Sequence, residues 1–429
     1  MPLSRRHLLT GLAATTAAAT TGEPQVSTLR PGLLTSPPPL FEKPASISIS
    51  ELESRRRTGP VLATEIHDFA PFGYTGPFTP SPPHADLNPR RAVIITFRDH
   101  PHRFVFSHEA SYVPWLELPE GVGLCNQFYE TNKAAELFND NGRKTRNSSV
   151  DILDPGPDRV WIRWNYICTH PDDNEHAKLR GTEDYVAYPN GLIWRRMTYQ
   201  SLSPDEPDGY SWQPIDFFCP VRADSTWSSL FPRDPQHNDY LVGSVLDAYS
   251  PRRYDKFWDD AGHPRRIGDP ELLLSICRGQ GLAIVAPFKA GHLFTALGPA
   301  SGFPANRSQV VDHSFKDTGG WGWGALRWDH WPIGWINSEA HDATIPSKYP
   351  WHFGQFSHYI TDVDSPIRNA KEDFPRALAN MDLNRWTERH VFYTLMGTAP
   401  NTDTIRRITK RWLDHGPQCA NPASIANLA

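Results

Sequence analysis

The stretch Arg159-Val-Trp-Ile-Arg-Trp-Asn-Tyr166 alternates between its two faces with a period of two. This period predicts a β-strand, because successive side chains of a strand point to opposite sides of the sheet. The face expected to be buried carries Val160, Ile162 and Trp164, and the opposite face carries Trp161, Arg163 and Asn165. That second face is polar and aromatic, so it is either the floor of a ligand site or the solvent side of the sheet.

Further strands are predicted on both sides of this stretch. Two strand-like runs within residues 184–199 flank Pro189-Asn190-Gly191, and Asn-Gly is the strongest short hairpin signal. The other predicted strands cover residues 91–97, 103–106 and 121–128, with a second hairpin formed by 272–277 and 281–288. Aromatic residues make up 12% of the chain, with 41 prolines and 29 glycines, a composition that favours strands joined by turns.

The pattern changes after about residue 365. Residues 369–381 and 385–396 have mixed helical character, and residues 402–413 predict an amphipathic helix capped by Thr402 or Asp403. The predicted fold is therefore mainly β, a β-sandwich of the supersandwich type with a C-terminal helical segment. A β-propeller is the alternative, although no repeat of about 40–50 residues is evident.

The N-terminus predicts export. Arg5 and Arg6 precede a short Ala/Thr-rich stretch, as in twin-arginine signals, so we expect a secreted or periplasmic protein. The predicted segments are a signal peptide at 1–22, a Pro/Ser/Thr-rich linker at 23–60, a β-rich catalytic domain at 61–365 and a helical segment at 366–429 packed on it. Without another long apolar stretch, no membrane partner is predicted.

The charge of the chain also limits its partners. Its 429 residues carry a net charge of −5 with no basic run, which argues against nucleic acid. The five cysteines are widely spaced and do not form a disulfide scaffold, and their connectivity and the oligomeric state stay open.

Five of the fifteen tryptophans lie within residues 321–335, with Arg327, Asp329 and His330 among them. Flat indole rings suit sugar faces, and their N–H groups can bond hydroxyls. Arg327 offers a fork for a carboxylate, and His330 is suited to proton transfer near neutral pH. The alternative is a Trp-rich turn packed over a sheet edge.

Two upstream clusters add candidates. His100 and His102 are spaced for ligation from one strand face, but the intervening Pro101 favours a turn, so no metal site is predicted. Tyr112 is either an acid/base group or a buried hydrogen-bonded tyrosine. Asn126 and Glu130 suit sugar hydroxyls or a uronate, although strand-end turns use the same residue types.

Several segments, in order along residues 90–415, resemble exported bacterial polysaccharide-degrading proteins of an ulvan-lyase-like family. They are Arg103-Phe-Val-Phe106, Ala110-Ser-Tyr-Val-Pro-Trp115, Asn126-Gln-Phe-Tyr-Glu130, Arg159-Val-Trp-Ile-Arg-Trp164, Tyr188-Pro-Asn-Gly191, Trp328-Asp-His-Trp-Pro-Ile333 and Thr409-Lys-Arg-Trp-Leu413. Ser107-His108-Glu109-Ala110 departs from the family's Trp-Arg-Gly-Thr. The resemblance implies a polysaccharide-active protein, and its departures leave the polymer open.

The leading hypothesis is a polysaccharide lyase that cleaves a uronate-containing, ulvan-like polymer by β-elimination. The predicted catalytic residues are His330, Tyr112, Arg327 and Asn126, and the predicted substrate-binding residues are Trp328, Trp331, Trp115, Glu130, Arg163 and Trp161. No cofactor is predicted, and a divalent metal stays open. The alternatives are a glycoside hydrolase using Glu130 and Asp329, or a non-catalytic carbohydrate-binding protein.

Overall fold

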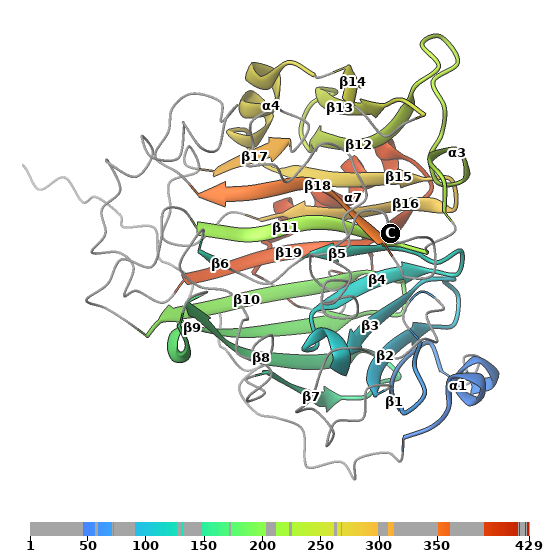
Figure 1. The fold of residues 1–429 in the computed structure, drawn as a ribbon, viewed down its shortest axis with the longest axis vertical. Helices are drawn as coiled ribbons and strands as arrows, with labels where there is room; N and C mark the ends of the chain where they lie inside the picture. Colours follow the sequence, from blue (N-terminus) through green and yellow to red (C-terminus); the bar gives the residue numbers. More distant parts are fainter. Residues whose placement is uncertain are drawn as a thin grey trace, which may run out of the picture. The chain divides into compact units, whose positions relative to one another are not determined.

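A computed structural model gives the fold of the chain (Figure 1). It describes residues 46–55, 59–70, 72, 91–126, 130–131, 148–170, 173–202, 212–222, 225–260, 264–266, 268–298, 308–312, 351–360, 390–418, 420, 425 and 427–428. The tryptophan-rich segment 321–335 lies outside these residues.

Most described residues belong to two antiparallel sheets. Sheet I has nine strands in the order β1-β2-β3-β4-β5-β11-β18-β17, with β6 also paired to β11. Its strands are β1 (Val61–Ile66), β2 (Ala92–Phe97), β3 (Arg103–Ser107), β4 (Pro114–Leu118), β5 (Val122–Asn126), β6 (Glu130–Thr131), β11 (Trp212–Val221), β17 (Ser308–Asp312) and β18 (Trp351–Ile360).

Sheet II has ten strands in the order β14-β13-β12-β15-β16-β19-β10-β9-β8-β7. They are β7 (Ser148–Asp154), β8 (Val160–His170), β9 (Asp173–Ala187), β10 (Ile193–Ser201), β12 (Tyr240–Asp247), β13 (Arg253–Trp258), β14 (Pro264–Arg266), β15 (Leu282–Phe288), β16 (Gly291–Leu297) and β19 (His390–Ala399). The described helices are α1 (Ile49–Arg55), α3 (Trp227–Leu230), α4 (Pro270–Cys277) and α7 (Thr402–His415), with a short 3-10 turn at His108–Ala110.

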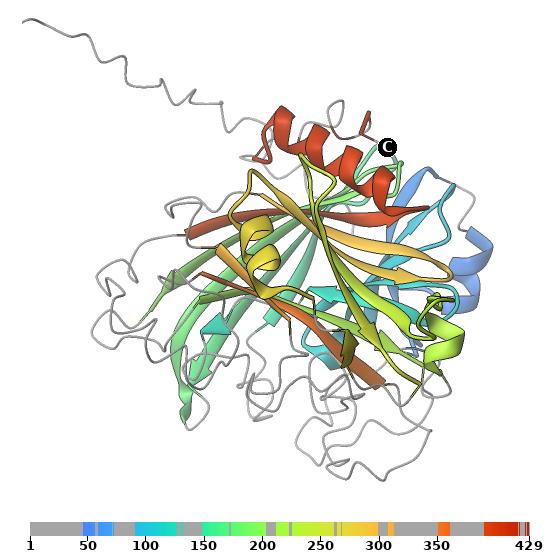
Figure 2. The same ribbon diagram turned by 90° about the horizontal axis from the view of Figure 1, so that it is seen from above.

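The two sheets pack face to face over one hydrophobic core. Phe104 and Phe106 of β3 contact the ring of Tyr185 on β9, with ring centroids 5.3 and 5.2 Å apart. α7 covers the opposite face of sheet II, where it packs on β12, β15, β16 and β19 (Figure 2). The predicted mainly-β sandwich with a C-terminal helix is thus confirmed. The described strands form two layers, not the radial blades of the propeller alternative.

The alternation predicted for residues 159–166 is also confirmed. Val160, Ile162 and Trp164 are fully buried on the inner face of sheet II, and Arg163 on the outer face is half-buried. The predicted hairpin forms from β9 and β10, and Gly191 closes its turn with a φ of 80°, in the left-handed region that favours glycine.

Three predictions of secondary structure are wrong. Residues 272–277 belong to helix α4, because Asp269 caps a helix that starts with Pro270. From His390 onward the segment predicted as helical is strand β19, which fills the middle of sheet II. α7 is capped by Asn401, whose side chain accepts a 2.9 Å bond from the Thr404 amide, and not by Thr402 or Asp403.

None of the described helices has the length and apolar character needed to cross a membrane.

Candidate functional site

The inner face of β8, β9 and β10 carries a buried polar cluster. Glu183 accepts hydrogen bonds from the Tyr166 hydroxyl at 2.9 Å and the Tyr185 hydroxyl at 2.5 Å. The Arg195 guanidinium reaches the same carboxylate, with Nε at 2.7 Å and a terminal nitrogen at 2.6 Å from Oε2. All four side chains are at most 1% exposed. We call these four residues the inner cluster.

Burial and the neighbouring carboxylate fix the charges of the inner cluster. Burial, reinforced by Glu183, raises the pKa of Tyr166 and Tyr185 well above the ordinary tyrosine value. Burial opposes the charged form of Arg195, but Glu183 and the two tyrosines outweigh it, so the Arg195 pKa is raised. Both phenols therefore stay protonated near neutral pH and act as hydrogen-bond donors, beside a permanently charged guanidinium.

Trp164 and Gly181 set the position of Tyr166. The rings of Trp164 and Tyr166 are 4.3 Å apart between centroids. A Cβ on Gly181 would overlap the Tyr166 ring, so only glycine leaves space for it. The Trp164 indole also donates a 3.2 Å bond to the backbone oxygen of Ser111, which links the inner cluster to the turn between β3 and β4.

That turn holds Tyr112 in an unusual backbone conformation. Ser111 and Tyr112 have φ values of 50° and 64°, and such left-handed geometry in consecutive non-glycine residues stores strain that often accompanies a functional site. Tyr112 is 5% exposed, and its ring centroid is 5.5 Å from that of His108. Tyr112 is therefore a buried tyrosine in a strained turn, and its role as an acid/base group stays a prediction.

Asn126 lies in the same layer. Its amide donates a 2.8 Å bond to the Thr295 hydroxyl on β16, and that hydroxyl lies 3.0 Å from Asn126 Oδ1. β19 connects this pair to the inner cluster, since Met396 is aligned with Thr295 on one side and with Ile193 of β10 on the other. Asn126 thus faces sheet II and is already bonded across the sheets.

Trp161 and Arg163 lie on the outer face of sheet II, beside the buried carboxylate of Asp184. Asp184 accepts bonds from the Trp161 indole at 2.9 Å, from Arg163 Nε at 2.8 Å and from Arg196 at 2.5 Å. The Arg163 guanidinium also lies 5.6 Å from the Trp161 ring, whose residue is only 2% exposed. Trp161 therefore supports the arginine and leaves no open face for a sugar ring.

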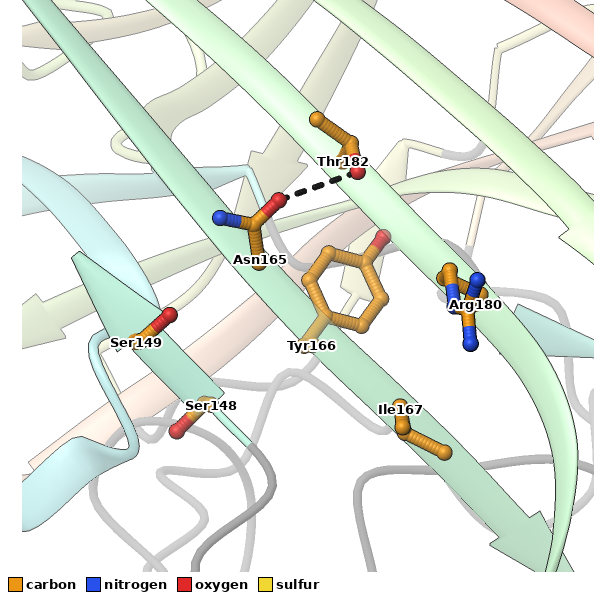
Figure 3. Close-up of a pocket in the computed structure, with 7 residues that line it drawn as sticks. All are labelled: Ser148, Ser149, Asn165, Tyr166, Ile167, Arg180 and Thr182. Atoms are coloured by element: carbon orange, nitrogen blue, oxygen red, sulfur yellow. Dashed lines mark hydrogen bonds between the residues drawn. The ribbon is translucent and has the colours of Figure 1, made fainter. Parts of the chain in front are cut away.

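A hollow of about 350 Å³ lies over β7, β8 and β9, and its lining includes Asn165, two residues along β8 from Arg163. Figure 3 shows the lining residues. Five of its lining residues share the outer face through the registers of β7, β8 and β9: Ser149, Asn165, Ile167, Arg180 and Thr182. Ser148 and Tyr166 complete the lining. The Thr182 hydroxyl donates a 3.0 Å bond to Asn165 Oδ1, which orients the amide (Figure 3). The volume is at the small end of the range for sites that hold a small molecule.

Of the remaining predicted residues, the structure describes Trp115 and the backbone of Glu130. Trp115 faces away from sheet II and is fully buried beneath Phe69 and Phe72, so no sugar can reach it. Glu130 lies on β6, with its backbone paired to Gln213 of β11. His330, Arg327, Trp328, Trp331 and Asp329 lie outside the described residues.

The histidine pair of the first upstream cluster is part of the packing. The His102 ring is buried and lies 3.0 Å from the Gly191 backbone oxygen and 3.2 Å from the Thr398 hydroxyl. The described residues include no group of three or more His, Cys, Asp or Glu side chains arranged to hold a metal ion.

No sequence motif identifies the inner cluster, which is formed by Glu183, Arg195, Tyr166 and Tyr185. A signal was present in the predicted hairpin, because alternation around its turn places Arg195 between Ile193 and Met197 on the apolar face. An arginine on such a face requires a buried partner. The pattern therefore predicts a buried polar site at Arg195, but it does not identify Glu183 as the acidic partner.

No family model matches the chain, and no curated protein matches it. Among solved structures it is similar to galactose 1-epimerase from Lactobacillus acidophilus NCFM, with 9% sequence identity and a TM-score of 0.28. That alignment covers 73% of this chain and 96% of the epimerase.

Proposed function

We propose that this protein is an exported enzyme that cleaves a uronate-containing polysaccharide by β-elimination. The observation that carries the proposal is the inner cluster, buried between the sheets and linked through Trp164 to the strained turn of Tyr112. A buried ion pair stabilises a core no better than apolar residues of the same volume. Its presence with two phenols in the sandwich core therefore favours a role in positioning the groups of a nearby site.

β-Elimination needs three groups: a base for the C5 proton, an acid for the leaving oxygen, and a cation or amide that neutralises the uronate. We assign the proton transfers to Tyr112 and His330, and the neutralisation to Arg327 and Asn126. The strained turn supports the role of Tyr112, because it fixes the phenol ring beside the ring of His108.

The inner cluster would act through fixed charges. Tyr166 and Tyr185 stay protonated, so neither is suited to remove a proton, and both hold the Glu183 carboxylate in place. Arg195 uses two of its nitrogens on the same carboxylate. Donors and charges that are already oriented need not reorganise during the reaction, which is the main source of electrostatic catalysis.

The test is incubation of the full chain with polygalacturonate, alginate and ulvan, followed by ultraviolet absorbance of the conjugated unsaturated product and by mass analysis. We expect absorbance to rise with at least one polymer. Tyr112→Phe should lower the rate by about 10²-fold or more, the usual contribution of an acid/base group. Tyr249→Phe is the matched control, because its hydroxyl bonds Asp414 at the surface near α7, away from the inner layer.

Other outcomes would support one of the two alternative functions or exclude Tyr112 from the reaction. Cleavage without the absorbance would support the hydrolase alternative, and amide variants of Glu130 and Asp329 would then be inactive. Retention on a polysaccharide column without any product would identify a carbohydrate-binding protein. An unchanged rate in Tyr112→Phe with an intact fold would remove Tyr112 from the mechanism.

A further inference from the structure

We infer that the outer face of β7, β8, β9 and β10 is a second saccharide site, which binds a carboxylate-bearing stretch of polymer. Its arginines lie on the face of sheet II opposite Glu183 and Arg195, and Tyr166 also lines the adjoining hollow. This inference goes beyond the proposed reaction and does not require that the protein cleave anything.

The first support is an excess of positive charge that is already oriented. Asp184, 2% exposed, is shared by Arg163 and Arg196, whose side chains are 32% and 27% exposed. Arg180 adds a third cation. The exposed Asp151 on β7 is aligned with Arg163 on β8, and its negative charge offsets one of the three positive charges. The three arginines and two aspartates of this face together carry one net positive charge, whereas the whole chain carries a net charge of −5.

The second support is that Arg163 has hydrogen-bond donors that bond no acceptor among the described residues. Within the part of the chain that the structure describes, Arg163 bonds Asp184 only through Nε, and its terminal nitrogens make no other hydrogen bond. Arg196 bonds the other oxygen of Asp184 through a terminal nitrogen, so the two guanidinium groups share the carboxylate. A planar guanidinium held in place by a buried acid is suited to bind a carboxylate with two parallel hydrogen bonds.

The third support is the hollow beside the arginine row. Asn165 lies two residues from Arg163 on the same face of β8, so the two side chains are about 7 Å apart along the strand. Asn165 Oδ1 is occupied by Thr182, which directs the amide nitrogen to another acceptor. With Ser149 and Ile167, the hollow offers polar groups for ring hydroxyls and an apolar wall for the ring itself.

These features together favour a uronate over other anions. A polyphosphate would need a longer basic run than this single row. A neutral sugar would leave the arginines without a ligand. A uronate places a planar carboxylate and ring hydroxyls within one residue, which matches a guanidinium next to a polar hollow.

The test measures binding of the full chain to polygalacturonate, with dextran and dextran sulfate as the neutral and the sulfated polymers. Polygalacturonate should bind more tightly than either. Arg163→Gln and Arg180→Gln should each raise the Kd by about tenfold to a hundredfold, as for loss of a charged hydrogen bond. Arg407→Gln is the matched control, because Arg407 is exposed on α7 and should leave the Kd unchanged.

A second variant protects the test from effects on folding. Thr182→Val keeps the side-chain shape, removes the hydroxyl that orients Asn165 and leaves all three arginines in place, so it should also weaken binding. Unchanged binding in all three variants, or equal binding of dextran or dextran sulfate, would overturn the inference. If no polymer is ever cleaved but binding still depends on Arg163, the proposed reaction fails while this site stands.

Discussion

At the scale of single residues, Gly181 sets the geometry of the inner cluster. The Tyr166 ring lies directly over it, in the space that a Cβ would occupy. Gly181→Ala should therefore displace the ring from Glu183 and lower the free energy of unfolding by about 1–3 kcal/mol, as overpacking does elsewhere. Urea unfolding of the full chain measures this.

The cause can be separated from a general effect of alanine by a double-mutant cycle. In a Tyr166→Ala background the ring is gone, so Gly181→Ala should cost much less than in the natural chain. If the two changes add within about 0.5 kcal/mol, the two positions are not coupled and the explanation by ring overlap is wrong.

His358 gives a pH dependence at the same scale. Burial lowers its pKa from 6.5 to about 4, so the folded protein holds this histidine neutral where the unfolded chain binds a proton. Stability should consequently be lost as the pH falls from about 6.5 to about 4, by about 3 kcal/mol over the whole window. The measurement is the free energy of unfolding against pH.

His358→Gln isolates this contribution, because carboxylates titrate in part of the same window. The variant should lose less stability than the natural chain between about pH 7 and about pH 5. Parallel curves for the two proteins would show that His358 does not titrate as its burial implies.

At the scale of elements, sequence patterns predicted strands where local and tertiary preferences agree. β2, β3 and β8 have apolar or alternating side chains and lie where the pattern placed them. Residues 272–277 are as apolar as a strand, but the capped start at Asp269-Pro270 decides for a helix. The local pattern of β19 predicts a helix, because the central place of this strand in sheet II is set by β10 and β16, which no local pattern encodes.

The cap of α7 provides a prediction for one element. Asn401 has an extended backbone, and its side chain bonds the Thr404 amide, which satisfies one of the free N–H groups of the first turn. Asn401→Ala should destabilise the protein by about 1 kcal/mol, whereas Asn401→Asp should be close to neutral. Thermal unfolding and amide exchange in α7 measure the effect. Equal losses for both variants would show that the side-chain bond is not the cause.

At the scale of the whole molecule, polar contacts join the two sheets at separate places. Asn126 bonds Thr295, Trp164 bonds Ser111, and Lys256 of sheet II forms a 3.0 Å ion pair with Asp312 of sheet I. Apolar contacts alone would allow many relative positions of the sheets, whereas these bonds are directional. The sequence could not reveal such pairs, since their members are up to 169 residues apart.

The Lys256–Asp312 pair allows this idea to be tested. Both side chains are 1% exposed, and Tyr254 donates a further bond of 2.7 Å to Asp312. Asp312→Asn leaves the buried ammonium without its opposite charge, so it should lower the free energy of unfolding by about 3–5 kcal/mol.

Burial already lowers the Lys256 pKa, and loss of the carboxylate removes the main opposing influence. The unfolded chain then holds the Lys256 proton to higher pH than the folded one, so the variant should become more stable from about pH 7 to about pH 9.

The double variant Lys256→Met/Asp312→Leu separates stability from the relative placement of the sheets. It removes both charges and keeps apolar volume, so its free energy of unfolding should return close to that of the natural chain. If the ion pair helps to fix one arrangement of the sheets, the double variant should lose near-ultraviolet circular dichroism, because aromatic side chains such as Trp258 and Phe356 pack around Lys256. A double variant with natural stability and an unchanged near-ultraviolet spectrum would show that apolar packing alone places sheet I on sheet II.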